Sequence, residues 1–258
     1  MEDYLLKAIA LEGKVRAYAI NSTQLVRELQ QRHHTWATAS AALGRTATIG
    51  AMMGAMLKDK EKLTIQVQGD GPLGQIVIDA NANGEVRGYV SNPQIDLPKN
   101  EKGKLDVASA VGKGNIYVIK DLGLKEPYRG STPIISGEIG EDFASYFARS
   151  EQIPSAVAVG VLVNTDHRIR ASGGVIIQVL PGLSNDEIER LETAVIGLDS
   201  VSKLIDQGLT PKDILEKIFG KQFKVLEQLK IRFKCNCSRE RIEPVSYTHL
   251  TLPTKRIV

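Results

Sequence analysis

The chain has 258 residues, of which 42% are hydrophobic and 24% charged, and its net charge is +3 at pH 7. This composition is ordinary for a globular protein and lacks the strong positive charge expected of a protein that binds nucleic acid. The longest uncharged run, residues 171–185, is too short to cross a bilayer, and the start of the chain does not resemble a signal peptide, so we expect a cytoplasmic protein without a membrane partner.

The first ninety residues predict helices and strands in turn. Weak alternation on both sides of Glu12-Gly13 predicts a hairpin, after which Ser22 or Thr23 can cap a short helix. Residues 38–57 predict a long helix, and the glycines within it indicate that other backbone packs closely against it. Period-two alternation then predicts three strands joined by turns: LTIQVQ, GQIVIDA and EVRGYVS.

The next part of the chain is also rich in strands. Three further apolar segments predict strands: NIYVIKDL, SAVAVGVLV and RIRASGGVIIQVL. A helix around residues 142–149 is expected between the first and the second of them. Because strands predominate and most connections are short turns, we expect residues 1–182 to form an α+β domain with largely antiparallel sheets packed with helices.

Residues 183–230 predict a helical linker. Ser184 can cap a helix that Gly208 ends, and Thr210 can cap a second helix with Asp213 facing it. The apolar faces of both helices are narrow, which indicates that the linker docks on a neighbouring element instead of building its own core.

The segment GDGPLG, residues 69–74, fits the glycine pattern of dinucleotide-binding loops. That fingerprint requires a helix after the loop, because the amides at the start of the helix hold the pyrophosphate. Here a predicted strand follows, and Pro72 suits a hairpin, so a turn is the favoured interpretation. A nucleotide-dependent enzyme that uses this loop is the alternative.

Two other clusters have a functional and a structural interpretation. Adjacent histidines on a helix point about 100° apart, so His33 and His34 are more typical of capping and packing than of a metal site. Met52, Met53 and Met56 could form an adaptable binding surface, although core packing is favoured. We find no constellation of catalytic residues and expect that the protein is not an enzyme.

Both cysteines of the sequence lie in one short segment, KCNCS, as Cys235 and Cys237. The lysines and arginines around them favour the thiolate, which binds soft metals and reacts with oxidants. A structural zinc site needs four ligands, and this pair supplies two. The two residues are therefore candidate metal ligands and redox-active thiols, or a chance pair. A thiol oxidoreductase is a further alternative, with a strained disulfide between them.

Taken together, these segments resemble the 33-kilodalton heat-shock family of redox-regulated bacterial chaperones. The resemblance covers residues 3–243 and rests on segments that follow one another in the family's order: RHHTWATASAALGRT, DANANGEVRGYVSNPQ, SGEIGEDFASY, SEQIPSAVAVGVLV and SKLIDQGLTPKDIL. It implies an ATP-independent holdase, usually a homodimer, that binds unfolding client proteins during oxidative stress and prevents their aggregation.

The resemblance also implies a redox switch. In the family, four cysteinates arranged as C-x-C and C-x-x-C hold Zn²⁺, and their oxidation to disulfides releases the metal and unfolds the linker. Cys235 and Cys237 match the first pair, and the second pair has no counterpart here. We therefore expect residues 231–243 to be an incomplete zinc domain that binds Zn²⁺ poorly. Residues 244–258 resemble translated adapter sequence more than a native tail.

The family's mechanism turns the apolar residues of the linker into candidates for client binding. Four such residues lie on the predicted apolar faces of its helices: Ile188, Leu191, Leu215 and Phe219. Packing within the chain explains these residues equally well, so their assignment to client binding is a hypothesis.

Overall fold

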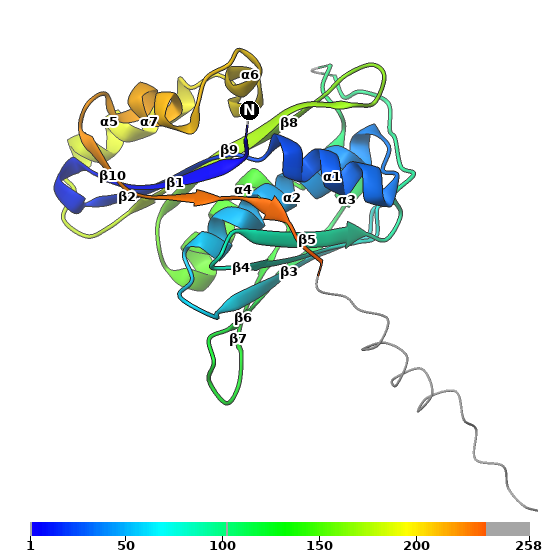
Figure 1. Ribbon diagram of the computed structural model, residues 1–258, viewed down its shortest axis with the longest axis horizontal. Helices are drawn as coiled ribbons and strands as arrows, with labels where there is room; N and C mark the ends of the chain where they lie inside the picture. Colours follow the sequence, from blue (N-terminus) through cyan, green and yellow to red (C-terminus); the bar gives the residue numbers. More distant parts are fainter. Residues whose placement is uncertain (1, 102, 236–258) are drawn as a thin grey trace, which may run out of the picture.

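Two β-sheets and two layers of helices make up residues 2–101 and 103–235, which the computed structural model describes (Figure 1). The five-stranded sheet has the order β10-β1-β2-β9-β8. Its strands are β1 (Tyr4–Ala10), β2 (Val15–Asn21), β8 (Ser155–Val163), β9 (Ile169–Val179) and β10 (Phe223–Lys230). Every neighbouring pair in it is antiparallel.

The six-stranded sheet has the order β11-β5-β4-β3-β6-β7. Its strands are β3 (Lys62–Gly69), β4 (Gln75–Asn81), β5 (Glu85–Val90), β6 (Gly114–Asp121), β7 (Tyr128–Pro133) and β11 (Arg232–Phe233). The short β11 runs parallel to β5, and the other pairs are antiparallel. The predicted α+β fold with largely antiparallel sheets is therefore confirmed.

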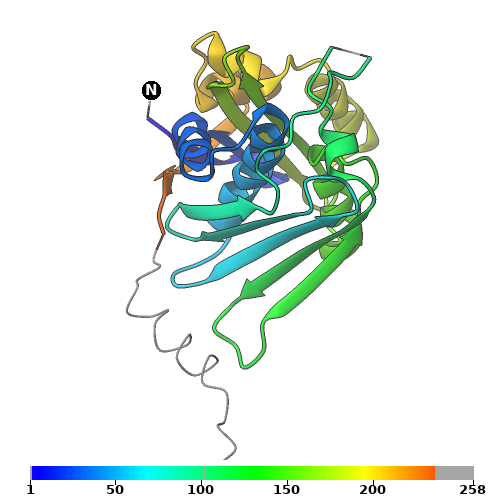
Figure 2. The ribbon, with the colours of Figure 1, turned by 90° about the vertical axis from the view of Figure 1, so that its right-hand side faces the viewer.

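The helices form one layer between the sheets and one outside the five-stranded sheet (Figure 2). The inner layer contains α1 (Thr23–His33), α2 (Ala37–Ala55), α3 (Val107–Val111) and α4 (Gly140–Tyr146). The outer layer contains the helices of the linker, α5 (Asn185–Ile196), α6 (Val201–Asp206) and α7 (Pro211–Phe219). The five-stranded sheet is thus covered on both faces.

Helix α2 is the centre of the main core, since it contacts strands of both sheets and every one of its residues except Arg45 is buried. A Cβ on Gly50 would lie 2.7 Å from Cγ2 of Ile78, and one on Gly54 would lie 2.9 Å from the carbonyl oxygen of Asn81. The expected close approach of other backbone to this helix is confirmed at Gly54, whereas side chains make the close contacts at Gly44 and Gly50. Met52 and Met53 are buried in the same core, as predicted.

The fold differs from the predicted secondary structure in several places, and α3, like β7, was not predicted. The helix expected to run from Ser184 to Gly208 is broken after Ile196, which lets α6 lie flat on β8 and β9. The edge strand β7 was not predicted, because its sequence YRGSTP is polar. The prediction that the linker is helical through residue 230 is wrong for residues 223–230, which form the strand β10.

Candidate functional site

The linker helices dock on the outer face of the five-stranded sheet. Helix α6 contacts β8 and β9, α7 contacts β1 and β2, and α5 packs on α7. Side chains on Gly160 and Gly173 would collide with Ser202 and Ile205 of α6, so these glycines allow the helix to lie close to the sheet. We call the resulting apolar cluster the linker interface; its buried members include Leu6, Ala17, Val175, Leu191, Val201, Leu204, Ile214 and Leu215.

The capping expected for the linker helices is present. Thr210 Oγ1 accepts a hydrogen bond from the backbone N–H of Asp213, whose carboxylate accepts one from the N–H of Thr210. Ser184 and Glu187 form the same reciprocal pair at the start of α5. Each such box stabilises a helix by about 1 kcal/mol, which supports the helices locally without fastening them to the sheet.

Three of the four predicted client-binding residues are hidden in the linker interface. Leu191 and Phe219 are each 7% exposed, Leu215 is fully buried, and Ile188 is partly buried. A client can reach the buried three only after the linker has left the sheet. Among the described residues, the ion pairs between these helices and the rest of the domain are Arg170–Asp206 at 2.6 Å and Lys14–Glu187 at 3.5 Å. Apolar contact therefore dominates the docking.

The segment that follows the linker helices connects the two sheets. We call residues 223–234 the strap; it begins as β10 beside β1 and ends as β11 beside β5 (Figure 1). Between the two strands, Ile231 is 3% exposed and packs in the main core. Its backbone N–H donates to the carbonyl oxygen of Asp3, and the N–H of Arg232 donates to that of Gly84. The strap therefore holds the residues that precede Cys235 against the domain.

An acidic clip holds the far end of the strap. The carboxylate of Glu85 accepts hydrogen bonds from Lys234 Nζ at 2.6 Å and from Arg232 Nη2 at 2.8 Å. The hydrogen bond from Lys234, and then the one from Arg232, lowers the pKa of Glu85 to about 2. The guanidinium of Arg32 lies 4.5 Å from the centre of the Phe233 ring, which adds a cation–π contact. These contacts end one residue before Cys235.

Replacing Glu85→Gln is expected to loosen this end of the strap. A lowered carboxyl pKa stabilises the folded state above pH 4.5, and that stabilisation is lost as the pH falls toward 2. Since both cations are largely exposed, solvent screening limits the effect to about 1 kcal/mol. We expect residues 232–235 of Glu85→Gln to exchange hydrogen faster than those of the wild type above pH 5. The control Glu101→Gln, on the loop between β5 and α3, should exchange like the wild type. Equal exchange in both variants would contradict it.

Asp3 joins the start of β1 to helix α1 and lies beside Ile231. Its carboxylate accepts hydrogen bonds from the backbone N–H groups of Gln24 and Leu25, at 3.0 and 2.7 Å, and so caps the helix from outside. The expected cap, Ser22 or Thr23, makes no such bond to the helix. Burial raises the pKa of Asp3 from 3.8 to about 6, against the opposing effect of those two hydrogen bonds.

The raised pKa of Asp3 predicts a pH-dependent stability. The folded state holds this proton up to about pH 6 and the unfolded state only to about 3.8, so the contribution is present at low pH and lost as the pH rises through 6. Between pH 7 and 5, the wild type should gain about 1 kcal/mol of unfolding free energy relative to Asp3→Asn. Denaturant titrations at the two pH values measure this difference. A difference that stays constant with pH would contradict it.

Cys235 is exposed at the end of the strap, beside Lys234. Its predicted partner, Cys237, lies outside the described residues. Among the residues that the structure describes, no group of three or more His, Cys, Asp or Glu side chains is placed to hold a metal ion. The two cysteines of the sequence supply half of a tetrahedral set of four thiolates. The metal assignment remains a prediction.

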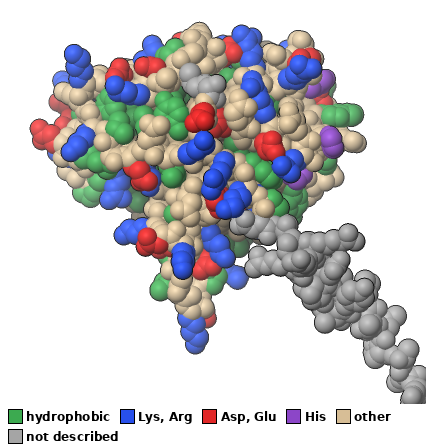
Figure 3. Space-filling model, viewed as in Figure 1, with side chains coloured by type: hydrophobic (Ala, Val, Ile, Leu, Met, Phe, Trp, Pro, Cys, Tyr) green, Lys and Arg blue, Asp and Glu red, His purple; other side chains and the backbone are tan. Residues whose placement is uncertain are grey.

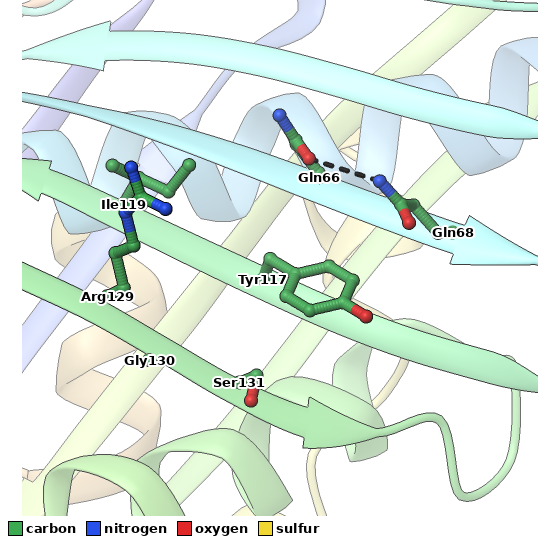
Figure 4. A pocket seen from close by; sticks show the side chains of 7 residues that line it. All are labelled: Gln66, Gln68, Tyr117, Ile119, Arg129, Gly130 and Ser131. Carbon is green, nitrogen blue, oxygen red and sulfur yellow. Dashed lines mark hydrogen bonds between the residues drawn. The ribbon is translucent and has the colours of Figure 1, made fainter.

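The other predicted motifs have structural roles. The GDGPLG loop joins β3 to β4 as a hairpin. A dinucleotide-binding loop requires a helix after it, and here the strand β4 follows. His34 ends α1 in the left-handed conformation, which is a capping position. A shallow hollow of about 260 Å³ lies on the outer face of the six-stranded sheet, lined by residues that include Gln66, Tyr117 and Arg129 (Figure 4). It holds no pairing of nucleophile and base.

Known proteins resemble this chain in sequence and in fold. The sequence model of a family described as Hsp33 protein matches residues 3–245. The chain belongs to the Hsp33 family. Among its relatives, the 33 kDa chaperonin of Bacillus cytotoxicus is 57% identical over 247 residues, which are 95% of this chain and 85% of the relative. The 33 kDa chaperonin of Geobacillus sp. (strain WCH70) is 58% identical over 94% of this chain and 83% of its own length.

A solved Hsp33 structure has the same fold. The crystal structure of the 33 kDa chaperonin of Thermotoga maritima matches with a TM-score of 0.91 and 38% sequence identity, over 96% of this chain and 85% of that one. The resemblance seen in the sequence is therefore confirmed, and the names of these Hsp33 relatives support a chaperone function. In the described part of the chain, no helix is long and apolar enough to cross a membrane.

Proposed function

We propose that the chain is an ATP-independent holdase of the Hsp33 family, which binds unfolding proteins in the cytoplasm during oxidative stress and prevents their aggregation. The observation that carries this proposal is the linker interface, an apolar sheet face covered by helices that few polar contacts fasten. Exposed apolar surface is what an unfolding client binds. A surface that can be covered and uncovered makes that binding adjustable.

Release of the linker supplies the binding surface. Undocking exposes Leu191, Leu215 and Phe219 on the helices and Leu6 and Val175 on the sheet, all of which are buried when the linker is docked. Helices with narrow apolar faces have little stability of their own, so undocking also unfolds them into a chain that can adapt to its client. The assembly that performs this is proposed to be a homodimer, without nucleic acid or membrane as a partner.

The thiol pair is proposed as the redox sensor. With hydrogen peroxide as oxidant, the thiols of Cys235 and Cys237 each lose one hydrogen, an Sγ–Sγ bond forms between them, and the peroxide is reduced to two molecules of water. The short loop closed by this disulfide is strained. That strain acts one residue from Lys234 and therefore on the clip to Glu85. Zn²⁺ would need two further thiolates, which a second copy of the chain could supply.

The test compares the reduced and the peroxide-treated chain in a light-scattering assay with a heat-unfolding client. Peroxide should lower the scattering for the wild type and leave a Cys235→Ser/Cys237→Ser variant unchanged. An equal response of both proteins would overturn the sensor assignment. Scattering that neither protein lowers, at one dimer per client, would overturn the holdase itself. Turnover in an insulin-reduction assay would instead indicate a thiol oxidoreductase.

A further inference from the structure

The strand β10 is held to the five-stranded sheet by little buried surface. Six of its eight residues are exposed, including Val225 at 37% and Leu226 at 57%. A bulge opposite Lys7 and Ala8 leaves Leu226 as an unpaired extra residue in the ladder. Hydrophobic side chains are visible over this end of the molecule, among lysine and acidic side chains (Figure 3). Backbone hydrogen bonds, the ion pairs Lys7–Glu227 and Lys230–Glu2, and the partly buried side chains of Phe223 and Leu229 hold the strand.

The strand beneath β10 has the opposite character. In β1, Leu5, Leu6, Ala8 and Ala10 are all less than 5% exposed, and they pack in both clusters, Leu5 in the main core and the others in the linker interface. When β10 leaves, β1 becomes an edge strand with apolar side chains on both faces. Such an edge pairs readily with another extended chain.

We propose that the edge of β1 is a client-binding site, at which an extended segment of the unfolding protein adds as an antiparallel strand after β10 has left. The proposal rests on the proposed holdase function, since it needs an unfolding client and a released linker. In this view β10 is an internal mimic of the client. While the linker is docked, β10 occupies the site, and its residues show which kind of segment can bind there.

The contacts of β10 define the preferred segment. Main-chain hydrogen bonds supply most of the interaction, which makes the site tolerant of sequence, as a chaperone requires. In β10, Val225 pairs with Ala8 and Phe223 pairs with Ala10. Apolar residues therefore suit alternate positions of the client segment. Glu227 pairs with Lys7 Nζ at 2.8 Å, so an acidic residue at that position is favoured.

The outer edge of β10 is a poorer site than the edge of β1. Its bulge interrupts pairing, and Lys224, Glu227 and Lys230 place charges along it, which are features that protect edges from further strands. At the opposite end of the sheet, β8 is contacted by α4 and α6. With the strap in place, the sheet therefore ends at the protected edge of β10. Release of the strap exposes the edge of β1, which can pair with another strand.

Hydrogen exchange of the full-length, peroxide-treated chain tests this, with reduced and carboxymethylated lactalbumin as a permanently unfolded client. Amides of residues 223–230 should exchange quickly after activation, and adding the client should slow those of residues 4–10 at least about tenfold while 223–230 stay fast. Client that binds while 223–230 remain protected, or that protects only the linker helices, overturns the proposal. Client that does not co-elute with the chain overturns the proposed function instead.

A peptide with the sequence of β10 and two N-methylated forms of it test the geometry of strand addition. The peptide FKVLEQLK reproduces β10 and should compete with the client for the activated chain. Neighbouring amides in a strand point to opposite sides, so of Gln228 and Leu229 one N–H faces β1 and the other faces away. Single backbone N-methylation at one of these two residues should abolish competition, and methylation at the other should leave it within about twofold. Equal competition by both peptides overturns the strand-addition geometry.

Discussion

The variant Leu215→Asp is expected to suppress client aggregation at a lower ratio of chain to client than the wild type, without oxidant. Leu215 is fully buried between α7 and the sheet. Losing its contacts and burying a carboxylate there costs about 3–5 kcal/mol, so the helix is expected to leave the sheet. Since 1.4 kcal/mol changes an equilibrium constant tenfold, the population with a released linker should rise at least about tenfold. Light scattering with a heat-unfolding client measures the gain.

The matched control for this variant is Leu124→Asp. Leu124 is 71% exposed on the loop between β6 and β7, so the same chemical change there leaves the linker docked and the activity unchanged. Limited proteolysis reports the state of the linker independently of the activity. A Leu215→Asp chain that is cleaved within residues 185–219 but scatters like the wild type would contradict the role of the linker interface.

The variant Ile231→Ala is expected to open the strap. Ile231 is the buried residue between β10 and β11, and it packs in the main core. Truncating such a side chain costs about 2–4 kcal/mol, which is a large share of what holds a segment whose other residues are mostly exposed. Hydrogen exchange at residues 223–235 should therefore accelerate at least about tenfold, together with the edge of β1 that the strap covers.

Val225→Ala is the control in the same segment. Val225 is 37% exposed and Lys224 and Leu226 beside it are exposed, so the change should alter strap exchange by less than about threefold. The global unfolding free energy of both variants separates a local from a general effect. If Ile231→Ala lowers global stability while the strap still exchanges in step with the core, the strap is not an independent unit.

Local sequence signals predicted much of this fold. The turn at Glu12-Gly13, the GDGPLG hairpin and the helix caps at Ser184 and Thr210 depend on neighbouring residues, which a sequence displays directly. The length of α2 was likewise predicted to within two residues, because its alanines favour a helix throughout.

The strap could not be predicted in the same way, because long-range pairing determines it. Phe223–Lys230 is a strand because the edge of β1 is open to it, and the bulge at Leu226 disturbs the alternation that would have indicated a strand. The clip joins Glu85 to Arg232 and Lys234 across about 150 residues, and no local pattern marks such a pair. The boundary predicted between residues 230 and 231 remains a prediction, although the strap crosses it.

The measurement that tests the central claim most directly is the aggregation of a heat-unfolding client with and without the chain, after peroxide treatment and in the absence of ATP. At two chains per client, the Hsp33 chain is predicted to hold scattering to a small fraction of that of the client alone. Scattering that rises as high as in a control with an equal mass of an inert protein would contradict the holdase function and, with it, the role assigned to the linker interface.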